Sequence, residues 1–167
     1  PSFSEDLAGF ARRRLLANVL ATSPIFEPFA GDDKRQFLSA FESHVVPAGE
    51  TVIREGGASP GLFVIVEGQV QVVKSDGDEP VVVAHLGPGD VFGEIALVLE
   101  RPATASVVTT ESCMLLQLPR GDFSGVARAR PEAKAYLDGL TETRLAELRS
   151  AHASPDAVLN ADDLVIV

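Results

Sequence analysis

Apolar residues recur every three to four positions at the start of the chain, a spacing that predicts helices. One helix is expected over residues 1–22, where two prolines in "SPIFEPF" follow the apolar positions. A second helix is expected at about 31–42, because Asp32 and Asp33 suit a first helical turn. The residues that carry the two apolar faces are Leu7, Phe10, Leu15 and Val19, and then Phe37, Leu38 and Phe41.

From residue 44 to residue 119 the apolar positions alternate or form short continuous runs, as in strands. Val70 and Val72 alternate with Gln69 and Gln71, so one face of that strand is expected to be buried. The run "LFVIVEG" is apolar throughout and is expected to lie deeper. Turn signals recur about every 8 to 15 residues, which is typical of a small antiparallel sandwich or barrel.

After residue 119 the helical spacing returns, with Pro131 and Gly139 as interruptions and Arg144 as a charge on the apolar side. The end of the chain, "LVIV", is interpreted as an added strand, a docking tail or a loose end. The apolar positions of the helical region are Phe123, Val126, Tyr136, Leu137, Leu140, Leu145 and Leu148.

These patterns predict an α+β fold, with an antiparallel β-roll (a double-stranded β-helix or jelly roll) flanked by helices. The expected division places N-terminal helices at 1–42 and the roll at 43–120. C-terminal helices follow at 121–152, and an acidic and apolar tail at 153–167.

Composition narrows the class of protein. About 46% of the residues are hydrophobic, which is enough for a buried core, and no run approaches 18 apolar residues, so no membrane partner is expected. The net charge of −10 opposes contact with nucleic acid phosphates, so no nucleic acid partner is expected either. The local exception, Arg12 to Arg14, is interpreted as a solvated helix face, with a patch for an acidic partner as the alternative.

The two remaining compositional features concern the setting of the protein. The single cysteine, Cys113, lies in an apolar run and is expected to be a buried thiol, which fits a reducing, cytoplasmic environment. The chain begins with Pro1 rather than Met, so we interpret it as a fragment of something larger.

The stretch "DVFGEIALVLERPATASV", residues 90–107, interrupts the strand pattern. Gly93 followed by a short helix would expose several backbone N–H groups in one direction, as in an anion nest. Glu94 would place a carboxylate beside that nest, where it suits a sugar hydroxyl better than a phosphate. An anion nest beside a sugar-binding carboxylate is typical of nucleotide recognition.

The stretch "FGEIALVLERPATASV" resembles the phosphate-binding cassette of the cyclic nucleotide-binding domain family. This family includes regulatory domains of cAMP-dependent kinase, cyclic nucleotide-gated channels and the Crp/Fnr transcription regulators. The resemblance covers about residues 20–150, because the ordered motifs "PAGE", "LFVIVEG" and "LGPGD" precede the cassette at the family's positions.

The resemblance implies a role for each matching residue. Gly93, Ile95 and Ala96 would give backbone donors to a cyclic phosphate, and Glu94 would accept the ribose 2′-hydroxyl. Thr104 resembles the variant that contacts guanine in cGMP-preferring members, a weak indication. The other residues that the resemblance assigns are Phe92 and Ala105 in the site, and Tyr136 and Leu140 as an apolar lid over the base, where plain helix packing is the alternative.

The departure from the family pattern is Ala103, which occupies the position of the arginine that neutralises the phosphate. Arg101 lies two residues earlier and is not expected to replace it. A charge-assisted hydrogen bond contributes about 1.5–3 kcal/mol, so loss of a bidentate pair weakens binding about a hundred- to a thousandfold. Three explanations stay open: an engineered change, a different ligand such as a cyclic dinucleotide or an uncharged molecule, or a vestigial site.

The function predicted from the resemblance is a bacterial-type, cytoplasmic sensor that binds cAMP or cGMP and repositions its flanking helices. The alternative is a degenerate domain that acts as a protein-interaction or dimerisation scaffold, or that binds another ligand such as cyclic di-GMP. A partner domain or a second copy would then contact the flanking helices. No catalytic residues and no cofactor are expected, and His44, His85 and His152 are too far apart in sequence for a metal-site motif.

Overall fold

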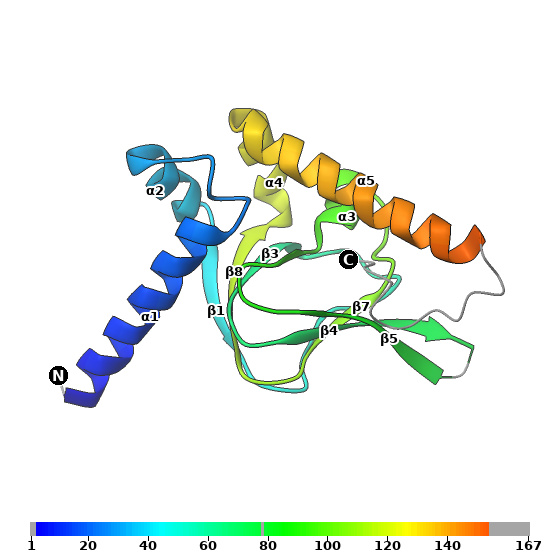
Figure 1. Cartoon of the computed structure of the whole chain (residues 1–167), viewed down its shortest axis with the longest axis horizontal. Helices are drawn as coiled ribbons and strands as arrows, with labels where there is room; N and C mark the ends of the chain where they lie inside the picture. Colours follow the sequence, from blue (N-terminus) through cyan, green and yellow to red (C-terminus); the bar gives the residue numbers. More distant parts are fainter. Residues whose placement is uncertain (1–2, 78, 154–167) are drawn as a thin grey trace.

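A computed structural model describes residues 3–77 and 79–153, in which helices flank a β-roll (Figure 1). None of the described helices is both long and apolar enough to cross a bilayer. The helices are α1 (Phe3–Thr22), α2 (Gly31–Ser39), α3 (Glu94–Val98), α4 (Arg120–Ala129) and α5 (Pro131–Ala153). The strands are β1 (Glu42–Val46), β2 (Thr51–Ile53), β3 (Gly61–Glu67), β4 (Val70–Asp76), β5 (Glu79–Leu86), β6 (Val91–Phe92), β7 (Ser106–Thr109) and β8 (Cys113–Pro119).

The strands form two four-stranded sheets, in the orders β1-β8-β3-β6 and β2-β7-β4-β5. Every pairing is antiparallel, and apart from the consecutive strands β4 and β5 the pairs join strands that are not neighbours in sequence, such as β1 with β8. This architecture confirms the α+β class and the antiparallel roll that the alternating pattern predicts.

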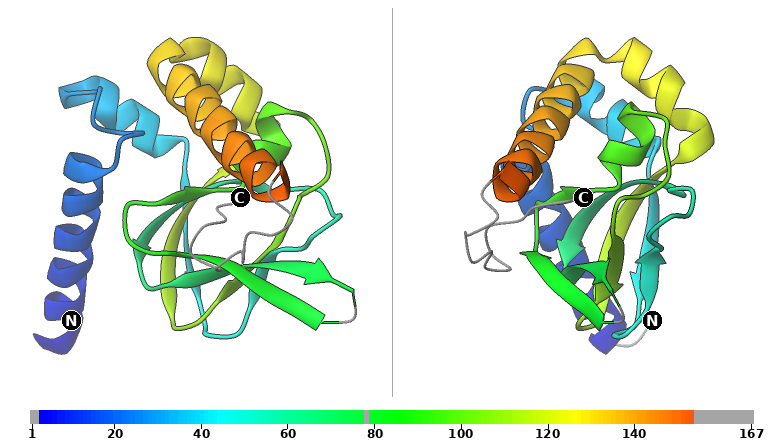
Figure 2. Two further views of the ribbon diagram at one scale, coloured as in Figure 1. Left: turned by 45° about the vertical axis from the view of Figure 1, so that its right-hand side comes forward. Right: turned by 90° about the vertical axis from the view of Figure 1, so that its right-hand side faces the viewer.

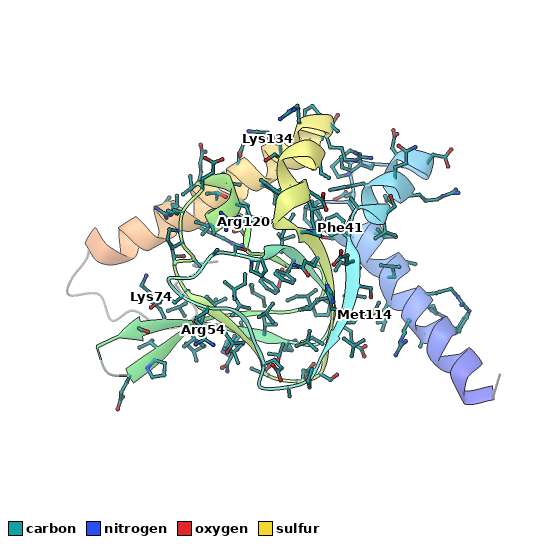
Figure 3. All side chains as sticks on the ribbon, turned by 180° about the vertical axis from the view of Figure 1, so that it is seen from behind. Phe41, Arg54, Lys74, Met114, Arg120 and Lys134 are labelled. Carbon is teal, nitrogen blue, oxygen red and sulfur yellow. The ribbon has the colours of Figure 1, made fainter. Side chains whose placement is uncertain are left out.

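Apolar side chains fill the space between the two sheets, which we call the inner core (Figure 3). Val70 and Val72 of β4 are fully buried there, as their alternation with glutamines predicts. Val72 lies opposite Val107 of β7, and Phe92 stacks on Phe63 with ring centroids 4.9 Å apart. The inner core is therefore closely packed beneath the cassette residues.

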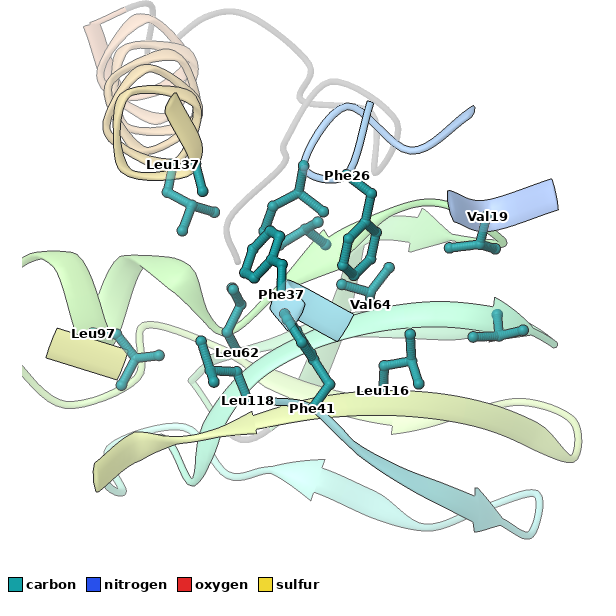
Figure 4. Close-up of a cluster of buried hydrophobic side chains, with 14 residues drawn as sticks. Val19, Phe26, Phe37, Phe41, Leu62, Val64, Leu97, Leu116, Leu118 and Leu137 are labelled. Atoms are coloured by element: carbon teal, nitrogen blue, oxygen red, sulfur yellow. The ribbon is translucent and has the colours of Figure 1, made fainter. Parts of the chain in front are cut away.

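A second cluster, the outer core, lies between the β3–β8 face and the helices (Figure 4). Phe26, Phe37 and Phe41 pack here with ring centroids 5.2 to 5.4 Å apart, at tilted or edge-on angles that aromatic pairs prefer. Leu137 of α5 and Leu97 of α3 join the same cluster. The outer core thus fixes α5 and the cassette helix against one sheet.

Helix α1 projects from one side of the roll (Figures 1 and 2). Val19 near its end is buried in the outer core, whereas Phe10 is 53% exposed. Arg12 to Arg14 are exposed, which agrees with a solvated helix face. The side chain of Leu7 lies outside the part of the chain that the structure describes.

Helix α2 ends at Ser39 rather than near residue 42 as expected. The amides of Ala40 and Phe41 donate to carbonyls three residues earlier, which tightens the chain into a final turn. Glu42 then begins β1 opposite Gln117 of β8, so strand pairing outweighs the helical pattern. Phe41 still packs in the outer core, as its apolar position predicts.

The helical region after the roll divides at Pro131, where α5 begins. Proline suits a first helical position because its missing N–H would have no partner there. The tail 154–167 and the side chain of Leu148 lie outside the described residues.

Candidate ligand site

Gly93 makes the turn from β6 into α3. Its backbone has φ 89°, a left-handed conformation that favours glycine. A Cβ at this position would lie 2.5 Å from the carbonyl oxygen of Gly61. The cassette backbone therefore approaches β3 as closely as only glycine permits.

A small cavity of about 10 Å³ lies beside this turn, space for about one water molecule. Apart from Ile53, Ser59 and Val107, its lining consists of residues that the sequence assigns to the site. Those residues are Gly93, Ile95, Ala96, Ala103, Thr104 and Ala105. The Ser59 hydroxyl is buried and donates to the carbonyl oxygen of Gly61 over 2.9 Å.

Ala103 is held by the loop between β2 and β3. Its N–H donates to the carbonyl of Gly57 over 2.9 Å, and its carbonyl accepts from the N–H of Gly56 over 2.8 Å. Its methyl group packs against the inner core. Arg101 is exposed on the preceding turn, so the structure does not bring it into the cavity lining.

The side chain of Glu94 points toward α5 and meets Arg144. Arg144 Nη1 donates to Glu94 Oε1 over 2.5 Å and to the carbonyl oxygen of Val91 over 3.1 Å. Glu94 is fully buried and Arg144 is 6% exposed. Glu94 Oε2 and Arg144 Nε are buried without a hydrogen-bond partner, so the ion pair is not bidentate. The cassette is therefore tied to α5 by one charged contact.

Burial raises the pKa of Glu94 to about 7, and the positive charge of Arg144 opposes that rise. Tyr136 lies on α5 about two helical turns before Arg144. Burial raises the pKa of Tyr136 above its usual value. The contact of Arg144 with Glu94, and the packing of Leu137 in the same cluster as Leu97 of α3, place this part of α5 over the cassette.

The structure places the remaining site residues outside the cavity. Phe92 is fully buried in the inner core, and Tyr136 and Leu140 pack at the edge of the outer core. The lid assignment for Tyr136 and Leu140 stays a prediction.

Sequence reasoning missed two charged residues near the cassette. Arg144 appears in the helical pattern only as a charge on an apolar face, and its partner Glu94 is 50 residues away. Lys74 Nζ donates to the carbonyl oxygen of Thr104 over 3.3 Å, a contact between β4 and the cassette. The sequence feature that could have pointed to Lys74 is its position two residues after Val72, which places it on the face of the strand that is expected to be buried.

His44 and His85, the histidines whose side chains the structure describes, do not belong to a metal-binding group. His44 lies 3.6 Å from the carboxylate of Glu42, and the side chain of His152 is outside the described residues. Within the described part of the chain, no group of three or more His, Cys, Asp or Glu side chains could hold a metal ion.

The family model described as "Cyclic nucleotide-binding domain" matches residues 43–130. The cyclic AMP receptor protein of Thermus thermophilus is 32% identical over 126 residues, which are 75% of this chain and 58% of that protein. The crystal structure of the Thermus thermophilus catabolite activator protein superposes with a TM-score of 0.70 at 31% identity, over 80% of this chain and 62% of that one.

The chain thus spans a little under two thirds of these relatives. Another similar structure is the regulatory subunit of a cAMP-independent protein kinase A from Trypanosoma brucei, with a TM-score of 0.58 at 25% identity over 80% of this chain and 53% of that one. The matched residues include both sheets and the whole cassette. This chain belongs to the cyclic nucleotide-binding domain family.

Proposed function

We propose that this chain is a regulatory sensor domain that binds a cyclic nucleotide of the cAMP or cGMP class and repositions its flanking helices. The contact between Glu94 and Arg144 carries the proposal. The family resemblance implies that Glu94 would accept the ribose 2′-hydroxyl, and in this structure the same carboxylate contacts Arg144 of α5. A ligand that engages Glu94 therefore acts on a group that also positions a helix.

The coupling follows from the incomplete ion pair. Glu94 Oε2 has no partner, although leaving a buried polar atom unsatisfied costs about 1–3 kcal/mol. A sugar hydroxyl would donate a hydrogen bond to that oxygen and favour the ionised form of Glu94, which strengthens its attraction to Arg144. A ligand shifts the position of α5 only by its different affinities for the two positions.

Binding, rather than catalysis, accounts for the groups at the site. The cavity lining consists of backbone, small apolar side chains and hydroxyls. The buried, unpaired thiol of Cys113 supports a reducing, cytoplasmic setting. A partner domain or a second copy of the chain would receive the signal through α1, α4 and α5.

Ala103 and the small cavity favour a second candidate, a degenerate domain that acts as a protein-interaction or dimerisation scaffold. Such a domain keeps the fold and the helical surfaces but does not require a ligand. The scaffold would be indifferent to changes at Glu94, whereas the sensor requires that carboxylate.

The test is calorimetric titration with cAMP, cGMP and cyclic di-GMP of the chain and of an Ala103→Arg variant. We expect the arginine to strengthen mononucleotide binding about a hundredfold or more, because it adds a bidentate charge-assisted contact. Hydrogen exchange of α5 should change on binding. If neither protein binds any of the three ligands, the sensor function is refuted and the scaffold is favoured.

A further inference from the structure

Lys74 is a charged residue on the inward face of a strand that otherwise contributes valines to the inner core. Val70 lies opposite Thr109 and Val72 opposite Val107, a regular register in which paired residues share a face. The pairing of β4 with β5 shifts by one residue between Val72 and Val73, but the pairing of β4 with β7 runs without a shift to Val73. Lys74 follows Val72 by two residues along β4 and is therefore on the same face. The pairing of β4 with β7 ends at Val73 opposite Ser106, the residue after Ala105, which lines the cavity.

The ammonium group of Lys74 reaches the cassette beside the missing arginine. Nζ lies 3.3 Å from the carbonyl oxygen of Thr104, the residue after Ala103. This long contact uses one of three N–H donors, so two stay available. No ion pair joins Lys74 to a carboxylate among the described side chains.

The neighbouring cations are less well placed. Arg144 is already engaged with Glu94 and with the carbonyl of Val91. Arg101 and Arg54 are exposed, whereas Lys74 is half-buried, and none of these three side chains lines the cavity itself. Figure 3 shows Lys74 on the strand that leads into the β4–β5 hairpin. Of these four cations, Lys74 is the one that contacts the cassette backbone without being paired with a carboxylate.

We propose that Lys74 supplies the positive charge for the ligand's phosphate in place of the arginine that Ala103 replaces. The inference rests on the proposed function. Lysine acts as a compact point charge and gives no bidentate geometry, so it would restore part of the lost affinity. The positive charge that attracts the phosphate would then come from β4 rather than from the cassette.

The test is a double-mutant cycle with Lys74→Gln and Ala103→Arg, read by calorimetric titration with cAMP and cGMP. Lys74→Gln should weaken binding about tenfold or more in the natural chain. In the Ala103→Arg background the same change should have less than about a threefold effect, because the arginine already neutralises the phosphate. Lys74→Arg should retain binding, and Arg54→Gln and Arg101→Gln serve as controls for nearby charge.

Salt dependence gives a second readout that a structural role would not change. Binding to the natural chain should weaken with ionic strength, and Lys74→Gln should reduce that dependence. Circular dichroism of each variant checks folding, and Lys74→Arg keeps the test valid if the glutamine variant folds poorly.

The outcomes separate this inference from the function on which it rests. If the natural chain and Lys74→Gln bind a cyclic nucleotide equally well, or if Arg54→Gln loses as much affinity as Lys74→Gln, the function stands and the role of Lys74 is overturned. If only proteins with Ala103→Arg bind, the natural chain is not a nucleotide sensor, and both the function and the role of Lys74 are overturned. If no protein in the cycle binds, both the proposed function and this inference fail.

Discussion

Replacement of Gly93 by alanine tests whether the cassette turn depends on a close backbone approach. Two effects act together at this position. The φ of 89° is unfavourable for an alanine, and the added Cβ would lie 2.5 Å from the Gly61 carbonyl oxygen. The same Cβ would lie 3.1 Å from Ile53 Cδ1 and 3.3 Å from the Ser59 hydroxyl.

Gly89 allows the two effects to be separated. It also has φ 89°, but a Cβ there would meet no atom within 4 Å. An alanine in left-handed conformation costs about 1–2 kcal/mol, which is the expected effect of Gly89→Ala. Overpacking against fixed neighbours adds about 1–3 kcal/mol, so Gly93→Ala should cost about 2–5 kcal/mol in total.

The assay is urea unfolding of both variants and the natural chain, followed by circular dichroism. The free energy of unfolding of Gly93→Ala should be about 1–3 kcal/mol below that of Gly89→Ala, at similar denaturant slopes. Equal values for the two variants would show that the Gly61 carbonyl moves freely. The account of the cassette as a rigid turn held against β3 would then be wrong.

Two further predictions follow from burial. Because the pKa of Glu94 is raised to about 7, the folded state binds a proton that the unfolded state releases above its ordinary pKa of 4.5. The contribution of Glu94 to the free energy of unfolding is therefore greatest below about pH 4.5. It falls by about 3 kcal/mol as the pH rises through 7. The check is urea unfolding of the natural chain and of Glu94→Gln at pH 5.5, 6.5 and 7.5. The free energy of unfolding of the natural chain should rise relative to that of Glu94→Gln as the pH falls. A difference that stays constant with pH would contradict the raised pKa. Phe37→Ala should cost about 3–5 kcal/mol because the ring is buried in the outer core, whereas the exposed Phe10→Ala should change stability by less than about 0.5 kcal/mol; similar losses for both would contradict the packing.

Local pattern was sufficient to predict much of the fold. Val70 and Val72 alternate with polar residues because one face of β4 is buried, and that relation between sequence and burial needs no knowledge of the partner strand. The break in alternation at Gly93 likewise marks the short helix α3. The end of α2 could not be read in this way, because pairing of Glu42 with β8 depends on residues about 75 positions later.

The charged contacts of the site could not be predicted for a related reason. Arg144 looked out of place in a helical apolar face, and only the three-dimensional position of α5 over the cassette supplies its partner Glu94. Lys74 lies near the end of its strand, where the alternating pattern does not decide whether the side chain is buried or exposed. Its proximity to Thr104 depends on the register between β4 and β7. The sequence motif specifies the cassette, whereas the cations around it come from distant segments.

Strand β3 separates the inner core from the outer core, and it has no face directed to solvent over most of its length. Phe63 and Ile65 belong to the inner core, whereas Leu62, Val64 and Val66 belong to the outer core. A helical layer that lifted away completely would leave an apolar sheet surface wet, at a cost of about 25 cal/mol for each Å² uncovered. We therefore expect any movement of the helices to be a pivot or a slide over the aliphatic and aromatic side chains of the outer core. Under the proposed function, the ligand would change the tilt or the position of the helices while they stay packed on the sheet.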